Sequence, residues 1–63
     1  MTALTRKIIS DLSAGPSCAD SLAQRVGITA NHAESELAIL AEQRKVETYP
    51  LESDPRYTVW RIR

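Results

Sequence analysis

The spacing of apolar residues changes along the chain and divides it into helical and extended parts. In the first segment, Leu4, Ile8 and Leu12 recur at four-residue steps with Ile9 beside them, so they share one face of a helix. The Gly-Pro pair at 15–16 follows directly, and this pair ends helices efficiently. A first helix is therefore predicted up to the residues before this pair.

A short second helix is predicted up to Gly27. Ser17 with Asp20 three residues later resembles a capping box, in which side chains at a helix start accept hydrogen bonds from backbone N–H groups. Gly27 should end the helix, because the turn that follows needs a positive φ. The apolar residues that share one face of this helix are Ala19, Leu22, Ala23 and Val26.

A third and longer helix is predicted from Thr29, which is a good N-cap. At about 100° per residue, one face is apolar and is expected to point inward. This inner face consists of Ala30, Ala33, Leu37, Leu40 and Ala41. The outer face consists of Asn31, His32, Ser35, Ile39 and Glu42.

The period then changes from helical to extended. The runs "KVETYPL" and "RYTVWRIR" are rich in β-branched and aromatic residues and alternate in character, which is typical of strands. Between them, "PLESDP" has the composition of a turn, with prolines at both ends. The two runs are interpreted as an antiparallel hairpin. A short third strand from the loop after the first helix stays open.

Composition limits the class of protein more than it identifies it. Sixty-three residues make one domain, and the absence of a long apolar run argues against a membrane partner. No signal peptide is visible, and the single cysteine, Cys18, cannot form an intrachain disulfide, so the cytoplasm of a microbe is the expected location. Eight basic and eight acidic side chains give no net charge, so any attraction to nucleic acid must be local.

This order of elements resembles the winged helix-turn-helix superfamily over nearly the whole chain. Its small, glycine and aliphatic pattern around the turn is matched by Ala23, Gly27, Ile28, Ala33 and Leu37. Leu40 and Val46, followed by the hairpin, match the passage from recognition helix to wing. The resemblance is to minimal prokaryotic members such as the small regulators of fimbrial operons. It implies an α+β fold, with residues 1–63 forming one winged-helix domain of three helices and a two-stranded hairpin.

In members of the superfamily that bind DNA, the third helix lies in the major groove and its first residues read base edges. The resemblance therefore implies double-stranded DNA as the partner and transcriptional regulation as the function. Asn31, His32 and Ser35 occupy the reading positions. The expected phosphate contacts are Thr29 at the helix start and the cations Arg25, Arg44, Lys45, Arg56, Arg61 and Arg63. One such domain buries little surface, so a homodimer or adjacent copies are expected.

The third helix also carries features that favour a protein partner. Glu34, Glu36 and Glu42 would repel phosphates. Ile39 lies in the middle of the outer face, where a groove-binding helix is usually polar, and is a candidate for the centre of an interface with a second copy or another protein. The alternative function is therefore a winged helix that binds protein and not DNA, such as a phage or plasmid accessory factor.

Other chemistry has little support in the sequence. We expect no enzymatic activity and no cofactor, because the chain has no Gly-rich phosphate loop and no nucleophile with an evident base. His32 has no cysteine or histidine at metal-ligand spacing, so no metal site is expected. The run "VWRIR" resembles the end of winged-helix domains that bind Z-DNA, in which a wing tryptophan meets an asparagine and a tyrosine. Those two positions are Glu34 and Ala38 here, so Trp60 is interpreted as a core or wing-packing residue.

Overall fold

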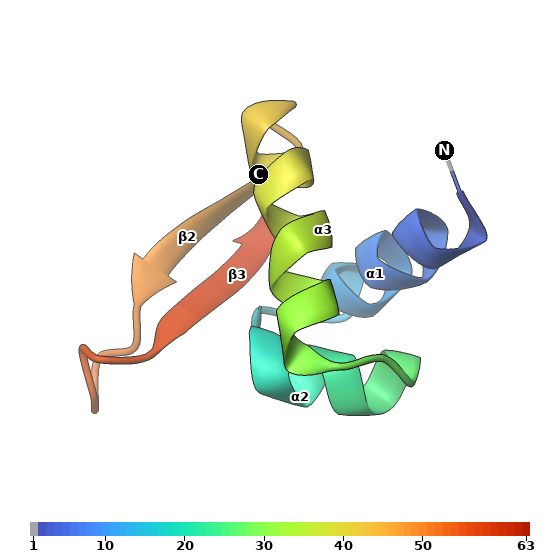
Figure 1. Ribbon diagram of the computed structural model, residues 1–63. Helices are drawn as coiled ribbons and strands as arrows, with labels where there is room; N and C mark the ends of the chain where they lie inside the picture. Colours follow the sequence, from blue (N-terminus) through green and yellow to red (C-terminus); the bar gives the residue numbers. More distant parts are fainter. Residues whose placement is uncertain (1) are drawn as a thin grey trace.

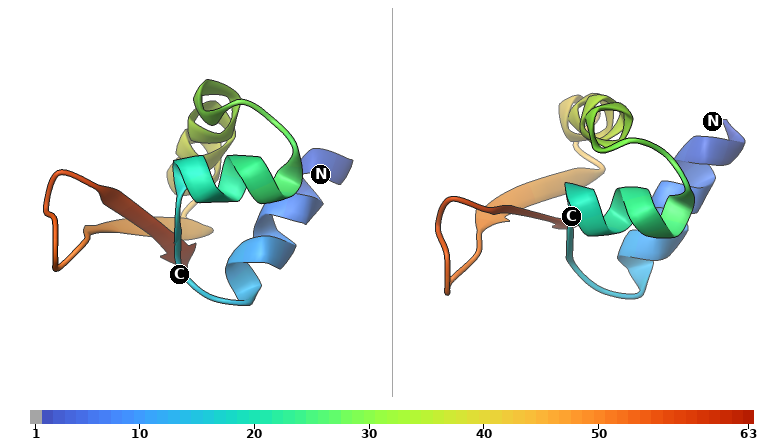
Figure 2. Two further views of the ribbon diagram at one scale, coloured as in Figure 1. Left: turned by 90° about the horizontal axis from the view of Figure 1, so that it is seen from below. Right: turned by 60° about the horizontal axis from the view of Figure 1, so that its bottom comes forward.

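Three helices and a small antiparallel sheet form one domain in the computed structural model, which describes residues 2–63 (Figure 1). The elements in chain order are α1 (Ala3–Ser13), β1 (Ser17–Cys18), α2 (Ala19–Val26), α3 (Ala30–Glu42), β2 (Val46–Pro50) and β3 (Thr58–Ile62). The hairpin of β2 and β3 lies on one side of α3 and α1 lies on the other, while α2 crosses near the N-terminal end of α3. Figure 2 shows the hairpin projecting away from the three helices as a wing. Within residues 2–63, no helix has the length and apolar character needed to cross a membrane.

The starts of α1 and α3 and the end of α2 follow local capping chemistry. The Thr2 hydroxyl accepts a hydrogen bond from the Thr5 N–H at the start of α1 (3.1 Å), and Thr29 does the same for the His32 N–H at the start of α3 (3.1 Å). Gly27 follows α2 with φ at 89°, in the left-handed region that glycine enters without a steric cost. The predicted Thr29 cap and the positive φ at Gly27 are therefore confirmed.

The predicted capping box at Ser17 is wrong. The N-cap of α2 is Cys18, and its side chain makes no capping hydrogen bond. Ser17 belongs to β1, where its backbone pairs with Trp60. Its hydroxyl donates to the carbonyl of Cys18 (3.2 Å) and accepts from Arg25, so it is not free to cap a helix.

The sheet has the strand order β1-β3-β2, so the third strand that the sequence left open is present and β3 is central. The N–H of Leu51 donates to the carbonyl of Tyr57 (3.0 Å), and the N–H of Arg63 donates to that of Lys45 (3.2 Å). Backbone N–H and C=O groups alternate in direction along a strand, so the backbone nitrogen and carbonyl of Pro50 point away from β3. A proline there costs no ladder hydrogen bond, which is why it is accepted at this edge.

The core lies between the inner face of α3 and the other helices. Its fully buried large side chains are Ile8, Leu22, Leu37 and Leu40. On α3, Ala33 is buried with these leucines, whereas Ala30 and Ala41 are half-buried. All five residues expected on the outer face are exposed, so the predicted division of this helix is confirmed.

The end of α3 has an unusual residue in its turn. Arg44 has φ at 59°, the only positive φ of a non-glycine residue between 2 and 63. The N–H of Arg44 donates to the Ala41 carbonyl (3.0 Å) and that of Lys45 to the Leu40 carbonyl (2.9 Å). This is a Schellman arrangement, in which glycine normally occupies the left-handed position.

Replacing Arg44 with glycine should therefore raise the free energy of unfolding by roughly 0.5–1 kcal/mol, because a Cβ is disfavoured at this φ. Thermal unfolding by circular dichroism would measure the gain, expected at a few degrees for a domain of this size. Arg44→Ala is the matched control, since it removes the charge and keeps the Cβ. An equal rise in both variants would attribute the gain to charge and not to backbone strain.

Candidate nucleic-acid interface

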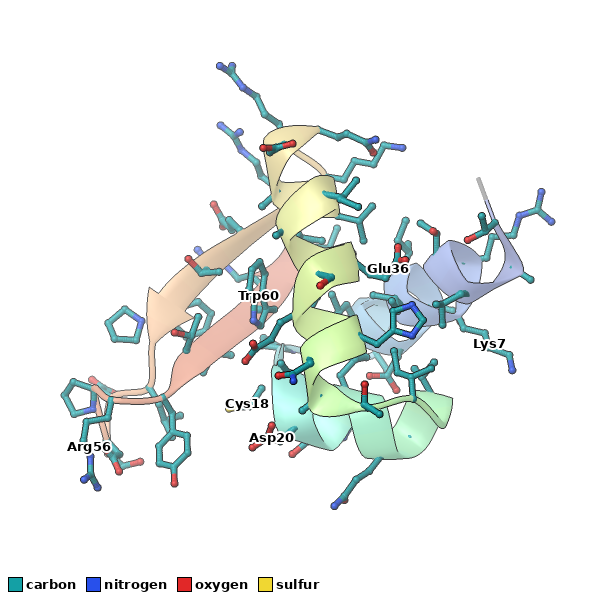
Figure 3. All side chains as sticks on the ribbon, viewed as in Figure 1. Lys7, Cys18, Asp20, Glu36, Arg56 and Trp60 are labelled. Atoms are coloured by element: carbon teal, nitrogen blue, oxygen red, sulfur yellow. The ribbon has the colours of Figure 1, made fainter. Side chains whose placement is uncertain are left out.

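The first two turns of α3 present the predicted reading residues on the surface. Asn31, His32 and Ser35 are exposed, and the helix start next to them is closed by the Thr29 cap. His32 Nε2 lies 3.6 Å from Glu36 Oε1, one turn further along the same helix. In Figure 3 Glu36 points from α3 toward the α1 side. The structure therefore brings Thr29, Asn31, His32 and Ser35 together at one end of α3.

Arg56 lies at the tip of the wing (Figure 3). Its side chain is 87% exposed, yet it is held by Asp54: Nε donates to Oδ1 (3.0 Å) and Nη2 donates to Oδ2 (3.0 Å). The hydrogen bonds from the Arg56 side chain, and then from its backbone N–H, hold the pKa of Asp54 below its ordinary value. Arg56 is thus oriented outward by a carboxylate that also offsets its charge.

Arg25, on α2, links α1 and β1 through side-chain hydrogen bonds. Its Nε and Nη2 donate to the two carboxylate oxygens of Asp11 on α1 (both 2.8 Å), and Nη2 also donates to the hydroxyl of Ser17. The hydrogen bonds between Asp11 and Arg25 lower the pKa of Asp11 and raise that of Arg25. The Arg25 side chain is 49% exposed, so part of it still reaches the surface.

Arg61 is placed on the sheet face away from α3. Trp60, its neighbour on β3, points toward α3 (Figure 3), and successive side chains of a strand point to opposite faces. Arg61 Nε donates to Glu47 Oε1 on β2 (2.7 Å), and its guanidinium lies 4.8 Å from the centre of the Tyr49 ring. Trp60 is half-buried and packs against the core cluster, as the sequence predicts.

The remaining predicted cations gather at the opposite end of α3. Arg44 and Lys45 follow its last turn, and the N–H of Arg63 binds the Lys45 carbonyl. A helix of 13 residues is roughly 20 Å long, so this group lies about that far from the reading residues. The structure does not bring Arg44, Lys45 and Arg63 together with Asn31 and His32.

A hollow of about 170 Å³ lies between the wing and the N-terminal ends of α2 and α3, and the sequence did not predict its acidic character. Asp20 and Glu34 line it, and neither makes an ion pair with another residue in the range 2–63. Arg56, Tyr57 and Trp60 complete the lining, and Tyr57 is 53% exposed. The sequence indicates only a helix-capping role for Asp20, and no sequence signal predicts its position beside the wing.

Comparison with known proteins identifies the fold. Neither family models nor curated proteins match the chain. Solved structures do match, each over 100% of this chain. Lactococcus lactis ZitR has a TM-score of 0.95 and 21% sequence identity, and the match covers 43% of its chain. The transcriptional regulator BldR from Sulfolobus solfataricus has a TM-score of 0.94, 21% identity and 45% of its chain covered, and the adhesin competence repressor AdcR from Streptococcus pyogenes has a TM-score of 0.94, 19% identity and 47% covered. The chain has the winged-helix fold, as its sequence predicts, and it spans less than half of the length of these proteins.

The Asp11–Arg25 pair makes a prediction about acid stability. The pKa of Asp11 is lowered in the folded protein, so this carboxylate contributes stability above its unfolded pKa and loses that contribution as pH falls through the folded pKa. The Asp11→Asn variant has no carboxylate at this position, so it cannot lose this contribution to stability at low pH. The melting temperature of the variant should therefore be lower than that of the wild type near pH 7, and should fall less steeply between about pH 5 and pH 2.

Thermal melts across this pH range would measure the difference. Asp20→Asn is the matched control, because Asp20 makes no ion pair in the described chain. Parallel pH profiles for the wild type and Asp11→Asn would contradict a stabilising role for the pair.

Proposed function

We propose that this chain binds double-stranded DNA as the DNA-contacting domain of a cytoplasmic transcriptional regulator. The observation that carries the proposal is the arrangement of α3: Ala33 and Leu37 fix its inner face in the core, and Asn31 and Ser35 are exposed on the first two turns. A helix held in this way can enter the major groove, where asparagine pairs bidentately with adenine and serine bonds to several base edges.

Two groups beside these residues suit the sugar–phosphate backbone. The Thr29 hydroxyl accepts from the His32 N–H and still has its own proton to donate to a phosphate oxygen. The first N–H groups of α3 have no partner within the helix and carry a partial positive charge. At the wing tip, the highly exposed Arg56 can bind phosphate while Asp54 keeps it extended.

The acidic groups around this surface limit the affinity that we expect. Asp20 and Glu34 line the hollow beside the wing, and Asp54 offsets the charge of Arg56. Arg25 and Arg61 are engaged with Asp11 and Glu47. The domain is therefore expected to bind DNA through few phosphates, with a shallow dependence on salt and a requirement for a homodimer or adjacent copies on the same duplex.

The names of the structural neighbours agree with this proposal. BldR is described as a transcriptional regulator and AdcR as a repressor. The second candidate function is a protein-binding winged helix without DNA contact, and the observation that favours it is Ile39, which is 50% exposed on the outer face of α3.

The wing contact can be tested by salt titration. Arg56→Ala should weaken binding to duplexes of any sequence and reduce the slope of log affinity against log salt by about one unit, because one phosphate contact is lost. Fluorescence anisotropy with a random-sequence duplex between about 20 and 200 mM salt would measure both effects.

Arg61→Ala is the matched control, because Glu47 holds Arg61 on the sheet face away from α3. A reduced slope in this variant and an unchanged slope in Arg56→Ala would move the backbone contact to that face. Absence of binding by the wild type at the lowest salt concentration would contradict the proposal and favour the protein-binding function.

Base reading by α3 is tested separately. Once a preferred duplex has been selected from a random pool, Asn31→Ala should reduce its preference over random duplex by about 1–3 kcal/mol, the usual contribution of one bidentate base contact. Gln43→Ala is the control, since this exposed amide lies at the far end of α3. Equal losses in the two variants would contradict reading by the N-terminal turns.

A further inference from the structure

A groove lies between the N-terminal end of α1 and the C-terminal half of α3, away from the proposed reading residues. Its volume is about 240 Å³, and its lining includes Thr2, Thr5, Glu36, Ile39, Gln43 and Lys45. The hydroxyls of Thr2 and Thr5 are hydrogen-bonded to each other (2.9 Å), so the α1 wall has part of its polar capacity satisfied. Ile39 is the large apolar side chain left half-exposed at this position.

The groove carries opposite charges on the two sides of Ile39. Glu36 precedes Ile39 by one turn of α3, and Lys45 follows beyond the end of the helix. Lys45 makes no ion pair with any residue from 2 to 63, and the partner of Glu36 in that range is His32 at 3.6 Å, which is charged only when protonated. Both ends of the groove therefore have charge to offer to a partner.

Glu42 is kept apart from this groove. It lines a different hollow with Trp60 and Val46, on the side of α3 that faces the hairpin. Around the axis of α3, Glu36 and Lys45 thus lie on the α1 side of Ile39, and Glu42 lies on the hairpin side. This division decides which charges meet when two such helices are placed antiparallel.

We propose that the groove is the docking site of a second copy of this chain, related by a two-fold axis next to Ile39. In an antiparallel pair around such an axis, residues on the α1 side of one helix meet residues on the α1 side of the other. Ile39 then packs on Ile39, and Glu36 of each copy comes level with the last turn of α3 in the other copy. Lys45 follows that turn on the same side, within about one helical turn along the axis, a distance that its long side chain spans. On the hairpin side, Glu42 lies opposite Ser35, and the packed Ile39 pair separates it from Glu36 of the other copy, which lies on the α1 side.

A second copy fits this groove better than other occupants because of the order of its charges. A nucleic acid or an acidic peptide would meet Glu36, and a basic peptide would meet Lys45. A partner must carry both signs in reverse order around an apolar centre, and a second copy does so by symmetry. The contact is small, so a dissociation constant of roughly 0.1–1 mM is expected.

The dimer has a consequence for recognition that rests on the proposed DNA-binding function. Helices in direct contact have axes about 8–10 Å apart. Recognition helices that enter successive turns of the major groove are separated by about 34 Å. The dimer through Ile39 therefore cannot place both α3 helices on DNA and differs from the arrangement of two copies on one duplex. Association through Ile39 withholds α3 from DNA until the copies separate.

A charge exchange tests the interface itself. Glu36→Lys and Lys45→Glu should each weaken association about tenfold or more, because like charges then face each other, and the double variant should restore it to within about threefold of the wild type. Sedimentation equilibrium at total protein concentrations from about 0.02 to 2 mM, which bracket the expected dissociation constant, would measure this. Circular dichroism would verify that each variant is folded.

Glu42→Lys is the matched control, since it makes the same exchange on the hairpin side and should leave association unchanged. A monomeric wild type up to 2 mM would overturn the proposal. So would a double variant that stays as weak as the single variants, or a loss in Glu42→Lys equal to that in Glu36→Lys.

A disulfide tests the effect on DNA binding. Ile39→Cys in a Cys18→Ser background should form a disulfide-linked dimer on oxidation, because the two-fold axis brings the two side chains together. The oxidised dimer should lose at least about tenfold in affinity for a random duplex, and a reducing agent should restore it. Equal binding by both forms would overturn the masking, whereas a reduced form that never binds would contradict the DNA-binding function and leave the dimer to be judged by sedimentation.

Discussion

Packing of the inner face of α3 is the constraint on which the rest of this domain depends. Leu37 and Leu40 are almost fully buried in one cluster with Ile8 and Leu22, so α3 cannot rotate about its axis without exposing the core. A domain of this size buries only about 60% of its unfolded surface, which makes each of these side chains important. The outer face follows from the inner one: once the leucines are placed, Asn31, Ser35 and Ile39 are presented to partners in fixed positions.

The central position of β3 connects this helical core to the wing. The pairing of β3 with β1 attaches the wing to the segment between α1 and α2. The pairing of β3 with β2 attaches it to the strand that follows α3 in the chain. The N-terminal end of α3 and the wing tip are therefore held in one arrangement by the sheet and the core. The two are separated by a hollow with unpaired carboxylates, which distinguishes this surface from a simple basic DNA-binding face.

Electrostatics divide the molecule more finely than its zero net charge suggests. Three of the expected phosphate contacts, Arg25, Arg56 and Arg61, are paired with carboxylates of the same chain. The cations that remain without such partners in the described chain include Lys45, at the end of α3 opposite Asn31 and Ser35. The two ends of α3 thus offer different chemistry: exposed neutral polar side chains at its start and an unpaired cation after its end.

The sequence alone determined the features that depend on neighbouring residues. The three helices, the Thr29 cap, the left-handed turn at Gly27 and the two faces of α3 all follow from local periodicity and capping, so they were predicted. The tertiary structure decided which distant residues meet. β1 is two residues long and carries no pattern of its own, and the Arg25–Asp11 and Arg61–Glu47 pairs join residues 14 positions apart. Whether an arginine is free or paired, and whether Asp20 lies beside the wing, depends on how the elements pack, because side chains of separate elements become neighbours only when the core forms.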